Sequence, residues 1–255
     1  PCRIDTGGTW DIKALALSHE GIQPTTVNAA LSLRTFVTLS SYKDGWVKIS
    51  SKGFSRSQAF LWDQLPFDSA FRTFFAAISY FGFHGLEVYI NSQSPLKSAL
   101  GGSSTALVAL IKALGKVSVG LGRKELSKKN ILHLAFHLED SIVGGNCGIQ
   151  DHAAAVYGGV QQWKWRYGHR TIPFESISLL NRKGQIELSK HLLVAYSGKS
   201  HISSRSNLTW IKDSLSGRTR VGWVRVNEIV HCFAQAIRDH NWNQAPPCTE
   251  IHFGV

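Results

Sequence analysis

The chain has 255 residues, of which 43% are hydrophobic, and its formal net charge is +11. A chain of this size can bury a real core and is long enough for one large or two modest domains. The positive charge favours an anionic partner, such as a nucleotide, a sugar phosphate, a nucleic acid or a membrane surface. Because the basic residues are dispersed and the tryptophans do not cluster with them, we expect no nucleic acid binding.

The sequence contains four scattered cysteines, no CxxC pair and no methionine. This cysteine usage predicts a reduced, cytoplasmic setting. No apolar run reaches the length of a membrane span and no signal peptide precedes Cys2, so we expect no membrane association. Ordinary composition predicts several methionines in a chain this long. We therefore expect that residues are missing from this sequence, and that some spacings are shorter than in the complete protein.

The N-terminal third is predicted to be mostly strands. Residues 2–5 predict a short strand that enters the polar loop Thr6–Asp11, where two glycines permit a tight backbone path. Strand-like segments with turn signals between them follow at 26–33, 34–42 and 46–52. Together they predict an antiparallel meander with one buried face.

A helix is predicted over residues 66–82, with Phe67, Phe71 and Ile78 on its buried side, and a strand over 85–90. The stretch 95–114, PLKSALGGSSTALVALIKAL, then begins as a Gly/Ser-rich loop and continues into a helix with apolar periodicity. The first N–H groups of a helix have no internal partners and lie at the positive end of its dipole. Because the side chains from Gly101 to Ser104 are small, an anion could approach those N–H groups closely. A plain Gly/Ser helix cap is the alternative.

A further helix is predicted over residues 125–142, with Ile131, Leu134, Leu138 and Ile142 inward. Its His133 and His137 have the spacing of a metal pair, but no HExxH motif accompanies them, so we treat them as packing or surface residues. The next segment, EDSIVGGNCGIQDHAAAVYGGV at 139–160, predicts a helix end, a Gly-Gly turn and a new helix with Asp151 in its first turn. Taken alone, that carboxylate would stabilise the helix dipole.

The remainder of the chain predicts short strands over 160–165 and 171–180 and a turn at 181–184, which is a candidate domain boundary. A buried strand is predicted over 192–196, and a helix over 226–240. Between them, Lys199 and Arg205 are candidates for contact with an anionic substrate, although exposed basic residues on a linker would look the same.

Three segments resemble the motifs of the GHMP small-molecule kinases. PLKSALGGSSTA at 95–106 is similar to the phosphate-loop motif PxxxGLGSSAA. GGNCGIQDHAAAVYGG at 144–159 is similar to GxxxGxQDxxAAxxGG, the aspartate segment of the sugar and heptose-phosphate kinase branch. RIDTGGTWD at 3–11 resembles the first motif, RxxxxGGxTD, but is one residue shorter. The third motif, a GAGxGG loop, is absent from these 255 residues.

The resemblance implies an α+β fold with two domains. Residues 1–185 would form the ATP-binding N-terminal domain, a mixed sheet with helices on one face. Residues 186–255 would begin a ferredoxin-like C-terminal domain that is only partly present. We expect the missing third motif to lie beyond Val255, in keeping with the absent methionines.

The resemblance also implies ATP-dependent phosphorylation of a hydroxyl group on a sugar or sugar phosphate, a heptose phosphate first of all, with ATP and Mg²⁺ as cofactors. Asp151 would act as the base and Arg3 would offset developing negative charge. Ser104 and Glu139 would bind Mg²⁺. The nucleotide phosphates would lie against Pro95, Lys97, Ala99, Leu100, Gly101, Gly102, Ser103, Ser104 and Thr105. The substrate would contact Gly8, Thr9, Asp11, Gly148 and Gln150.

Two alternatives stay open. One is a GHMP-fold kinase or decarboxylase that acts on a non-sugar substrate, although Gln150 and the GGTWD loop favour a sugar. The other is a catalytically silent nucleotide- or sugar-binding regulator, which would be expected to lose Asp151 or Glu139, and both are present. The sequence does not decide the oligomeric state, and a homodimer is one option.

Overall fold

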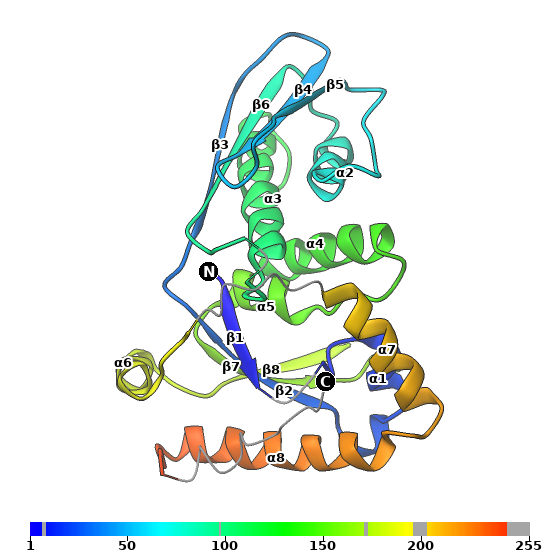
Figure 1. Cartoon of the computed structure of the whole chain (residues 1–255). Coiled ribbons are helices and arrows are strands. Elements are labelled where there is room, and N and C mark those ends of the chain that lie inside the picture. The colour runs from blue at the N-terminus through cyan, green and yellow to red at the C-terminus, as the bar shows by residue number, and fades with distance from the viewer. Residues whose placement is uncertain (7–8, 97, 171–172, 196–202, 244–255) are drawn as a thin grey trace. The chain divides into compact units, whose positions relative to one another are not determined.

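The computed structural model describes residues 1–6, 9–96, 98–170, 173–195 and 203–243, with the backbone alone at 203–205 (Figure 1). The described residues form two compact units, each built around its own four-stranded sheet. Unit 1 comprises residues 1–2, 31–147 and 151–157. Unit 2 comprises residues 3–30 and 148–150 and the described residues from 158 onward. The fold is α+β, as predicted.

The sheet of unit 1 has the strand order β3–β6–β4–β5. Strand β6 (Leu86–Ser92) runs antiparallel to β3 (Thr35–Ser41) and parallel to β4 (Trp46–Ser51), and β4 pairs with β5 (Gln58–Leu61) in antiparallel fashion. The sheet is therefore mixed. The predicted meander is wrong: β6 lies between β3 and β4, and the first of the three predicted strands belongs to the other sheet.

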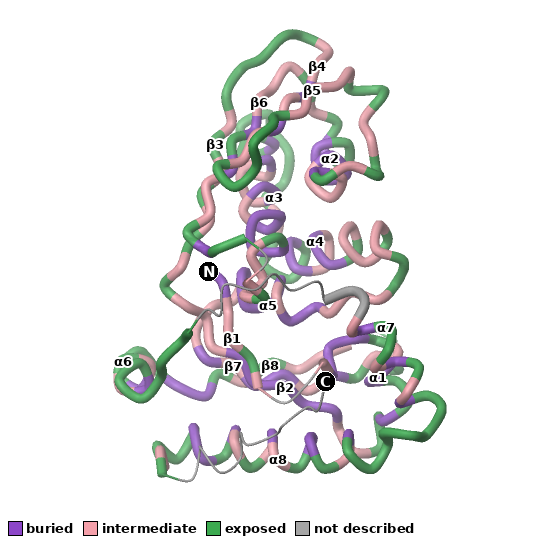
Figure 2. The backbone as a smooth tube through the Cα atoms, in the orientation of Figure 1, coloured by how far each residue is buried: buried purple, intermediate pink, exposed green. Residues whose placement is uncertain are grey.

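Helices α2 (Arg72–Phe81), α3 (Gly102–Gly120) and α4 (Lys128–Ile142) complete most of unit 1, and helix α3 packs against β3, α2 and α4. Figure 2 shows α3 buried along part of its length, with exposed residues toward its C-terminal end. By length and composition α3 could cross a membrane, contrary to the sequence-based expectation, but half of its apolar window is buried inside the protein. Its apolar face forms the core through Leu107, Leu110, Ile111 and Leu114.

Two details of the predicted helices are corrected. Helix α2 begins at Arg72 rather than near residue 66, and the side chain of Phe67 is 53% exposed rather than buried. In α4, the buried positions are Ile131, Leu132, Ala135 and Phe136, so the inward face is rotated from the one predicted. The rotation follows from the neighbours, because α2 and α3 both pack against this helix.

The sheet of unit 2 is antiparallel throughout, in the order β1 (Arg3–Thr6), β2 (Thr25–Ala30), β7 (Val160–Trp165) and β8 (Phe174–Ser178). Its core includes Val27, Val160, Leu179 and several residues of the last helix. The helical elements of unit 2 are α1 (Lys13–Leu17), the 3-10 helix η1 (Glu20–Ile22), α6 (Arg182–His191), α7 (Ser203–Leu215) and α8 (Arg220–Arg238).

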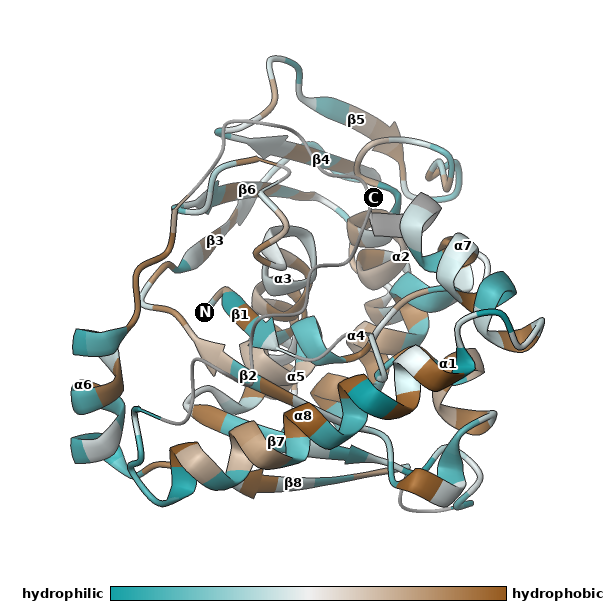
Figure 3. Cartoon of the chain, turned by 60° about the horizontal axis from the view of Figure 1, so that its bottom comes forward, coloured by the Kyte–Doolittle hydropathy of each residue, from teal (hydrophilic) through white to brown (hydrophobic). Residues whose placement is uncertain are grey.

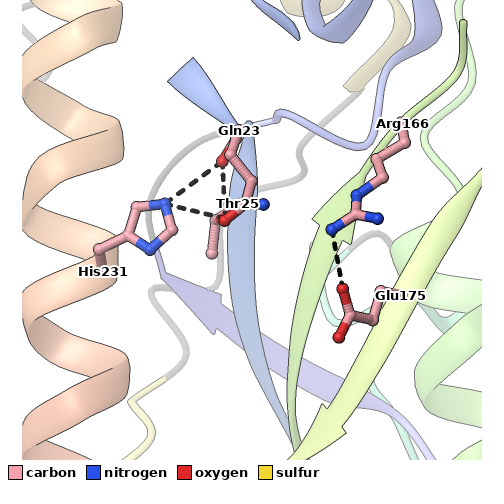
Figure 4. A network of polar contacts seen from close by, with 5 residues as sticks. All are labelled: Gln23, Thr25, Arg166, Glu175 and His231. Atoms are coloured by element: carbon pink, nitrogen blue, oxygen red, sulfur yellow. Dashed lines mark hydrogen bonds and ion pairs between the residues drawn. The ribbon is translucent and has the colours of Figure 1, made fainter. Parts of the chain in front are cut away.

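Helix α8 packs against β2, and its hydrophobic and hydrophilic residues alternate along its length (Figure 3). Buried Asn227 accepts the backbone N–H of Thr25 at 2.9 Å and donates to the carbonyl oxygen of Ile22 at 2.7 Å. His231 Nε2 lies 3.2 Å from the Thr25 hydroxyl and 3.3 Å from the Gln23 carbonyl oxygen (Figure 4). These polar contacts fix the helix against the start of β2. Figure 4 also shows the ion pair that joins Arg166 to Glu175, at 3.0 Å, across β7 and β8.

Two predictions for the C-terminal part are wrong. Residues 181–184 are the start of α6 rather than a turn, because the Asn181 side chain accepts the N–H of Gly184 and caps the helix. Residues 192–195 are not a buried strand: they carry no regular structure, and Leu193 is 93% exposed. Lys199 and the side chain of Arg205 lie outside the described residues. The division into domains 1–185 and 186–255 stays a prediction.

Candidate active site

The Gly-rich loop of unit 1 leads directly into the N-terminus of α3. Gly101, just before α3, has φ +71° and ψ 28°, a left-handed conformation that glycine adopts without strain. Gly101 is the N-cap residue of α3 and makes no side-chain cap, and the first turn of the helix carries no acidic residue. The first N–H groups of this nineteen-residue helix have no partners within the helix, so they are suited to receive an anion. This arrangement is what a phosphate site needs.

The same loop holds a non-glycine residue in the left-handed region. Ala99 has φ +59°, which costs a residue with a Cβ about 1–2 kcal/mol relative to the right-handed region. Backbone strain of this kind persists only where the surroundings impose it, and it clusters at ligand-binding sites. Left-handed residues at 99 and 101 shape the approach to α3.

The aspartate segment meets this loop. Asp151 lies in the first turn of α5 (Gln150–Tyr157), and its carboxyl carbon is 3.0 Å from the position that a Cβ on Gly101 would occupy. Only a residue without a side chain allows this approach. Two motifs about fifty residues apart in the chain therefore come together within unit 1, and Asp151 sits beside the N-terminus of α3.

A hydrogen-bonded trio lies close by in the same unit. The Ser104 hydroxyl donates to Glu139 Oε2 at 2.9 Å, and His152 Nε2 lies 2.7 Å from the same oxygen. Ser104 is 3% exposed and His152 is fully buried. Burial by itself raises the pKa of Glu139, but the hydrogen bonds from His152 and Ser104 and the positive charge of Arg72 outweigh it. The net result is a pKa below the ordinary glutamate value.

The lowered pKa of Glu139 predicts how the free energy of unfolding depends on pH. A carboxylate whose pKa is lower in the folded than in the unfolded state stabilises the fold above its unfolded pKa, and that contribution is lost as the pH falls through the folded value. Replacing Glu139 with glutamine should lower the free energy of unfolding at pH 7 by about 1–3 kcal/mol, because charged hydrogen bonds are lost. The gap between wild type and E139Q should close below pH 4.5.

Urea denaturation of both proteins from pH 7 to pH 3, in EDTA so that no metal contributes, measures this difference. The matched control is Glu125→Gln, which changes an exposed carboxylate of the same unit and should leave the free energy nearly unchanged. Parallel curves for wild type and E139Q across the whole range would contradict the prediction.

The donor set of Ser104 and Glu139 fits a Mg²⁺ ion. Their oxygens are 2.9 Å apart, which is about the separation of adjacent oxygen ligands around an octahedral Mg²⁺ with bonds of about 2.0–2.1 Å. A hydroxyl and a carboxylate are also the hard oxygen donors that this ion prefers.

The predicted substrate residues of unit 2 belong to a polar cluster in which Asp11 and Gln150 are buried, Arg3 is half-buried and Asp5 is exposed. Arg3 pairs with Asp5 at 2.7 Å, and the Gln150 side-chain amide donates to Asp5 Oδ2 at 3.0 Å. The backbone N–H of Gln150 donates to Asp11 Oδ2, also at 3.0 Å. Asp11 is 1% exposed, and its carboxylate packs so closely on Gly148 that no side chain fits there. The contacts of Asp11 thus fix the start of α5, and a sugar-binding role for it stays a prediction.

The other predicted residues are distributed unevenly. Ser103 is exposed at the start of α3, whereas Thr105 is buried and its hydroxyl donates to the Pro1 carbonyl oxygen at 3.0 Å. Gly8 and Lys97 lie outside the described residues. His133 and His137 stack on each other with their ring centroids 5.9 Å apart. Of the remaining predicted positions, the structure describes Thr9 and Leu100 as half-buried and Pro95 as exposed.

Two residues that organise the site, His152 and Asp140, were not predicted from the sequence. His152 contacts Glu139, and Asp140 Oδ1 accepts the N–H of Cys147 at 3.0 Å, which holds the loop between α4 and α5. Each follows directly after a residue that had been singled out, Asp151 or Glu139. A polar residue next to each member of two converging motifs is the signal that could have found them.

Parts of the chain are similar to known proteins. Residues 68–159 match the GHMP kinases N terminal domain. The chain is 29% identical over 181 residues to a D-glycero-alpha-D-manno-heptose 7-phosphate kinase of Campylobacter jejuni, covering 68% of this chain and 51% of that protein. It is 27% identical over 170 residues to a mevalonate kinase of Thermococcus onnurineus, covering 60% and 49%. The chain thus spans about half the length of these relatives.

A solved structure, that of a D-glycero-D-manno-heptose 1-phosphate kinase from Bacteriodes thetaiotaomicron, superposes with a TM-score of 0.65 at 18% identity, over 97% of this chain and 74% of that one. At this identity the superposition supports the fold alone. The matched domain contains the Gly-rich loop, Glu139 and Asp151, which are the residues that the structure brings together. Residues 68–159 of this chain are therefore similar to the N-terminal domain of the GHMP kinases, within a fold that resembles the superposed structure.

Proposed function

We propose that the protein transfers the γ-phosphoryl group of ATP to a hydroxyl group of a sugar phosphate, with a heptose phosphate as the preferred acceptor. The observation that carries the proposal is the contact of the Asp151 carboxylate with Gly101, at the N-terminus of α3. A phosphate-binding helix end and a carboxylate that can accept a proton are then side by side. Phosphoryl transfer depends mainly on such positioning and on charge neutralisation.

In this proposal the backbone N–H groups at residues 101–104 bind the phosphates of ATP. The N-terminus of α3 supports this role, because its first N–H groups have no intrahelical partners and the N-cap residue, Gly101, has no side chain to cover them. The net charge of +11 favours anionic substrates generally.

Ser104 and Glu139 would hold the Mg²⁺ ion. When bound, the ion neutralises charge on the phosphates. His152 donates to Glu139 from a fully buried position, and it therefore fixes the carboxylate and keeps it ionised at neutral pH. A carboxylate that is already charged and oriented can bind a cation without reorganisation.

Asp151 would accept the proton of the acceptor hydroxyl as the phosphoryl group arrives, or orient that hydroxyl. Its position against Gly101, beside the phosphate-binding end of α3, supports this role. Arg3, Asp11 and Gln150 remain predicted contributors, and their contacts with one another and with Asp5 are those of a rigid polar cluster in unit 2.

Phosphorylation of mevalonate is a second candidate, favoured by the similarity to mevalonate kinases of two Thermococcus species. The heptose phosphate is preferred because, of the two relatives described above, the heptose kinase has the higher identity, 29% against 27%, over the longer match. The segment GIQDHAAA also resembles the version of the aspartate motif in that branch.

An ADP-release assay on the purified protein tests both candidates. Sugars, heptose phosphates and mevalonate are supplied with ATP and Mg²⁺, and a reaction without acceptor gives the background rate. We expect release above background with a heptose phosphate. Release with mevalonate alone would replace the first proposal by the second. Background rates with every acceptor, from a protein that binds ATP, would support the silent regulator instead.

A further inference from the structure

Three metal-binding side chains of different chemistry converge beside the proposed Mg²⁺ pair. A carboxylate oxygen of Glu139, the sulfur of Cys147 and a ring nitrogen of His152 all lie within 4.8 Å of one another. Glu139 lies near the end of α4, Cys147 in the loop that follows, and His152 in the first turn of α5. All three belong to unit 1. His152 is fully buried, and the other two are partly exposed.

The loop between α4 and α5 is built to return Cys147 to the end of α4. Gly144 and Gly145 have φ values of +79° and +80°, which turn the chain sharply. The Asp140 carboxylate accepts the Cys147 N–H at 3.0 Å, and its carbonyl oxygen accepts the Gly145 N–H at 2.9 Å. The residue that holds the loop is the neighbour of Glu139, so the thiol and the carboxylate are kept close by short-range contacts.

We propose that Glu139, Cys147 and His152 form a binding site for a transition-metal ion, with zinc as the preferred ion. Thiolate and imidazole ligands select such ions, whereas Mg²⁺ takes oxygen ligands. In a tetrahedral zinc site with bonds of about 2.0–2.3 Å, the ligand atoms are about 3.3–3.7 Å apart. All the donor atoms lie within 4.8 Å of one another, so small side-chain rotations can bring them to these separations. His152 Nε2 and Glu139 Oε2, now 2.7 Å apart, would move apart to admit the ion.

Three protein ligands leave the fourth position of the ion to water or to a phosphate oxygen. On binding, Cys147 would give its thiol proton to solvent. His152 would give up its contact with Glu139, and the Nε2 proton would pass to solvent or to Nδ1, so that Nε2 could bind the ion. Because Glu139 is the ligand that this site shares with Ser104, zinc should also compete with Mg²⁺. The competition between zinc and Mg²⁺ rests on the proposed function, whereas the binding of zinc does not.

Cobalt serves as the spectroscopic probe, because Co²⁺ occupies zinc sites and a thiolate ligand gives it a strong charge-transfer absorption. The EDTA-treated, dialysed protein is titrated with Co²⁺ without nucleotide, and Zn²⁺ is then added. We expect one equivalent of Co²⁺ to produce the charge-transfer band and Zn²⁺ to abolish it. A wild-type protein that gives no such band would overturn the proposal.

Cys147→Ser should remove the band and weaken zinc binding at least about tenfold, measured by competition with a chelator. The matched control is Cys232→Ser, which removes an exposed thiol of α8 and should leave both unchanged. Loss of the band in C232S rather than C147S would overturn the proposal. If C147S does not fold, protection of Cys147 from alkylation by zinc in the wild-type protein decides the same point.

Kinase assays then separate this inference from the proposed function. If the protein is active, C147S should keep its Mg²⁺-dependent rate and lose inhibition by micromolar zinc. A protein that binds Co²⁺ through Cys147 but releases no ADP would retain the metal site and lose the proposed activity. A protein that is active as a kinase but shows no thiolate band would retain the proposed activity and lose the metal site.

Discussion

Replacing Asp151 with asparagine is expected to lower kcat by about 10²–10⁴-fold, the usual contribution of a positioned general base. Asparagine keeps the size of the side chain and so preserves the close packing on Gly101. It cannot accept the proton of the acceptor hydroxyl. Steady-state ADP release measures kcat, and isothermal titration with a non-hydrolysable ATP analogue measures nucleotide affinity, which should change little.

The matched control is Asp63→Asn, which makes the same chemical change at an exposed position of the same unit and should leave kcat unchanged. A D151N protein that keeps the wild-type rate would remove Asp151 from the reaction, even if the α3 loop still bound ATP. If KM for the acceptor rises while kcat is constant, the carboxylate contributes only uniform binding.

Adding one methyl group at Gly101 is expected to have the second large effect. In Gly101→Ala the new Cβ would lie 3.0 Å from the Asp151 carboxyl carbon, and the residue would be held at φ +71°. The left-handed backbone alone costs about 1–2 kcal/mol with a Cβ present. Either Asp151 moves away or the loop rearranges. We expect a loss of about 1–3 kcal/mol in the free energy of unfolding and a fall of at least about tenfold in kcat/KM.

Gly115→Ala is the matched control, since it makes the same substitution inside α3. Its Cβ would meet only Leu126, at an ordinary 3.8 Å, and alanine is favoured over glycine in a helix by about 0.5–1 kcal/mol. G115A should therefore be equally or more stable and fully active. Urea denaturation and ADP release measure both variants. A G101A protein as stable and active as G115A would mean that the close contact with Asp151 has no consequence.

Local structure was largely predictable because its causes lie within a few residues. The apolar spacing from Leu107 to Leu114 identifies the buried face of α3, and the Gly-Gly-Ser-Ser run before it marks a helix end that can receive an anion. Asp151 in the first turn of a short helix was expected on the same grounds. The alternation of residues 46–51 likewise identified β4.

Partnerships between segments were not predictable in this way. Hydrogen bonds between strands look the same whichever strand supplies them, so the sequence near β3 and β4 cannot indicate that β6 lies between them. The prediction of a buried strand at 192–195 was wrong for a related reason. An apolar run is buried only where a neighbouring surface covers it, and this segment is exposed. The rotated face of α4 was decided by α2 and α3.

By itself, the sequence determined the two helix starts, their charge preferences and the resemblance to a kinase family, because capping and dipole effects act within one turn. The tertiary structure alone decided that the carboxylate of Asp151 rests on Gly101, and that Ser104, His152 and Cys147 gather around Glu139. These contacts depend on how helices α3, α4 and α5 pack against one another. Packing is set by the fit of many buried side chains at once, which no short stretch of sequence contains.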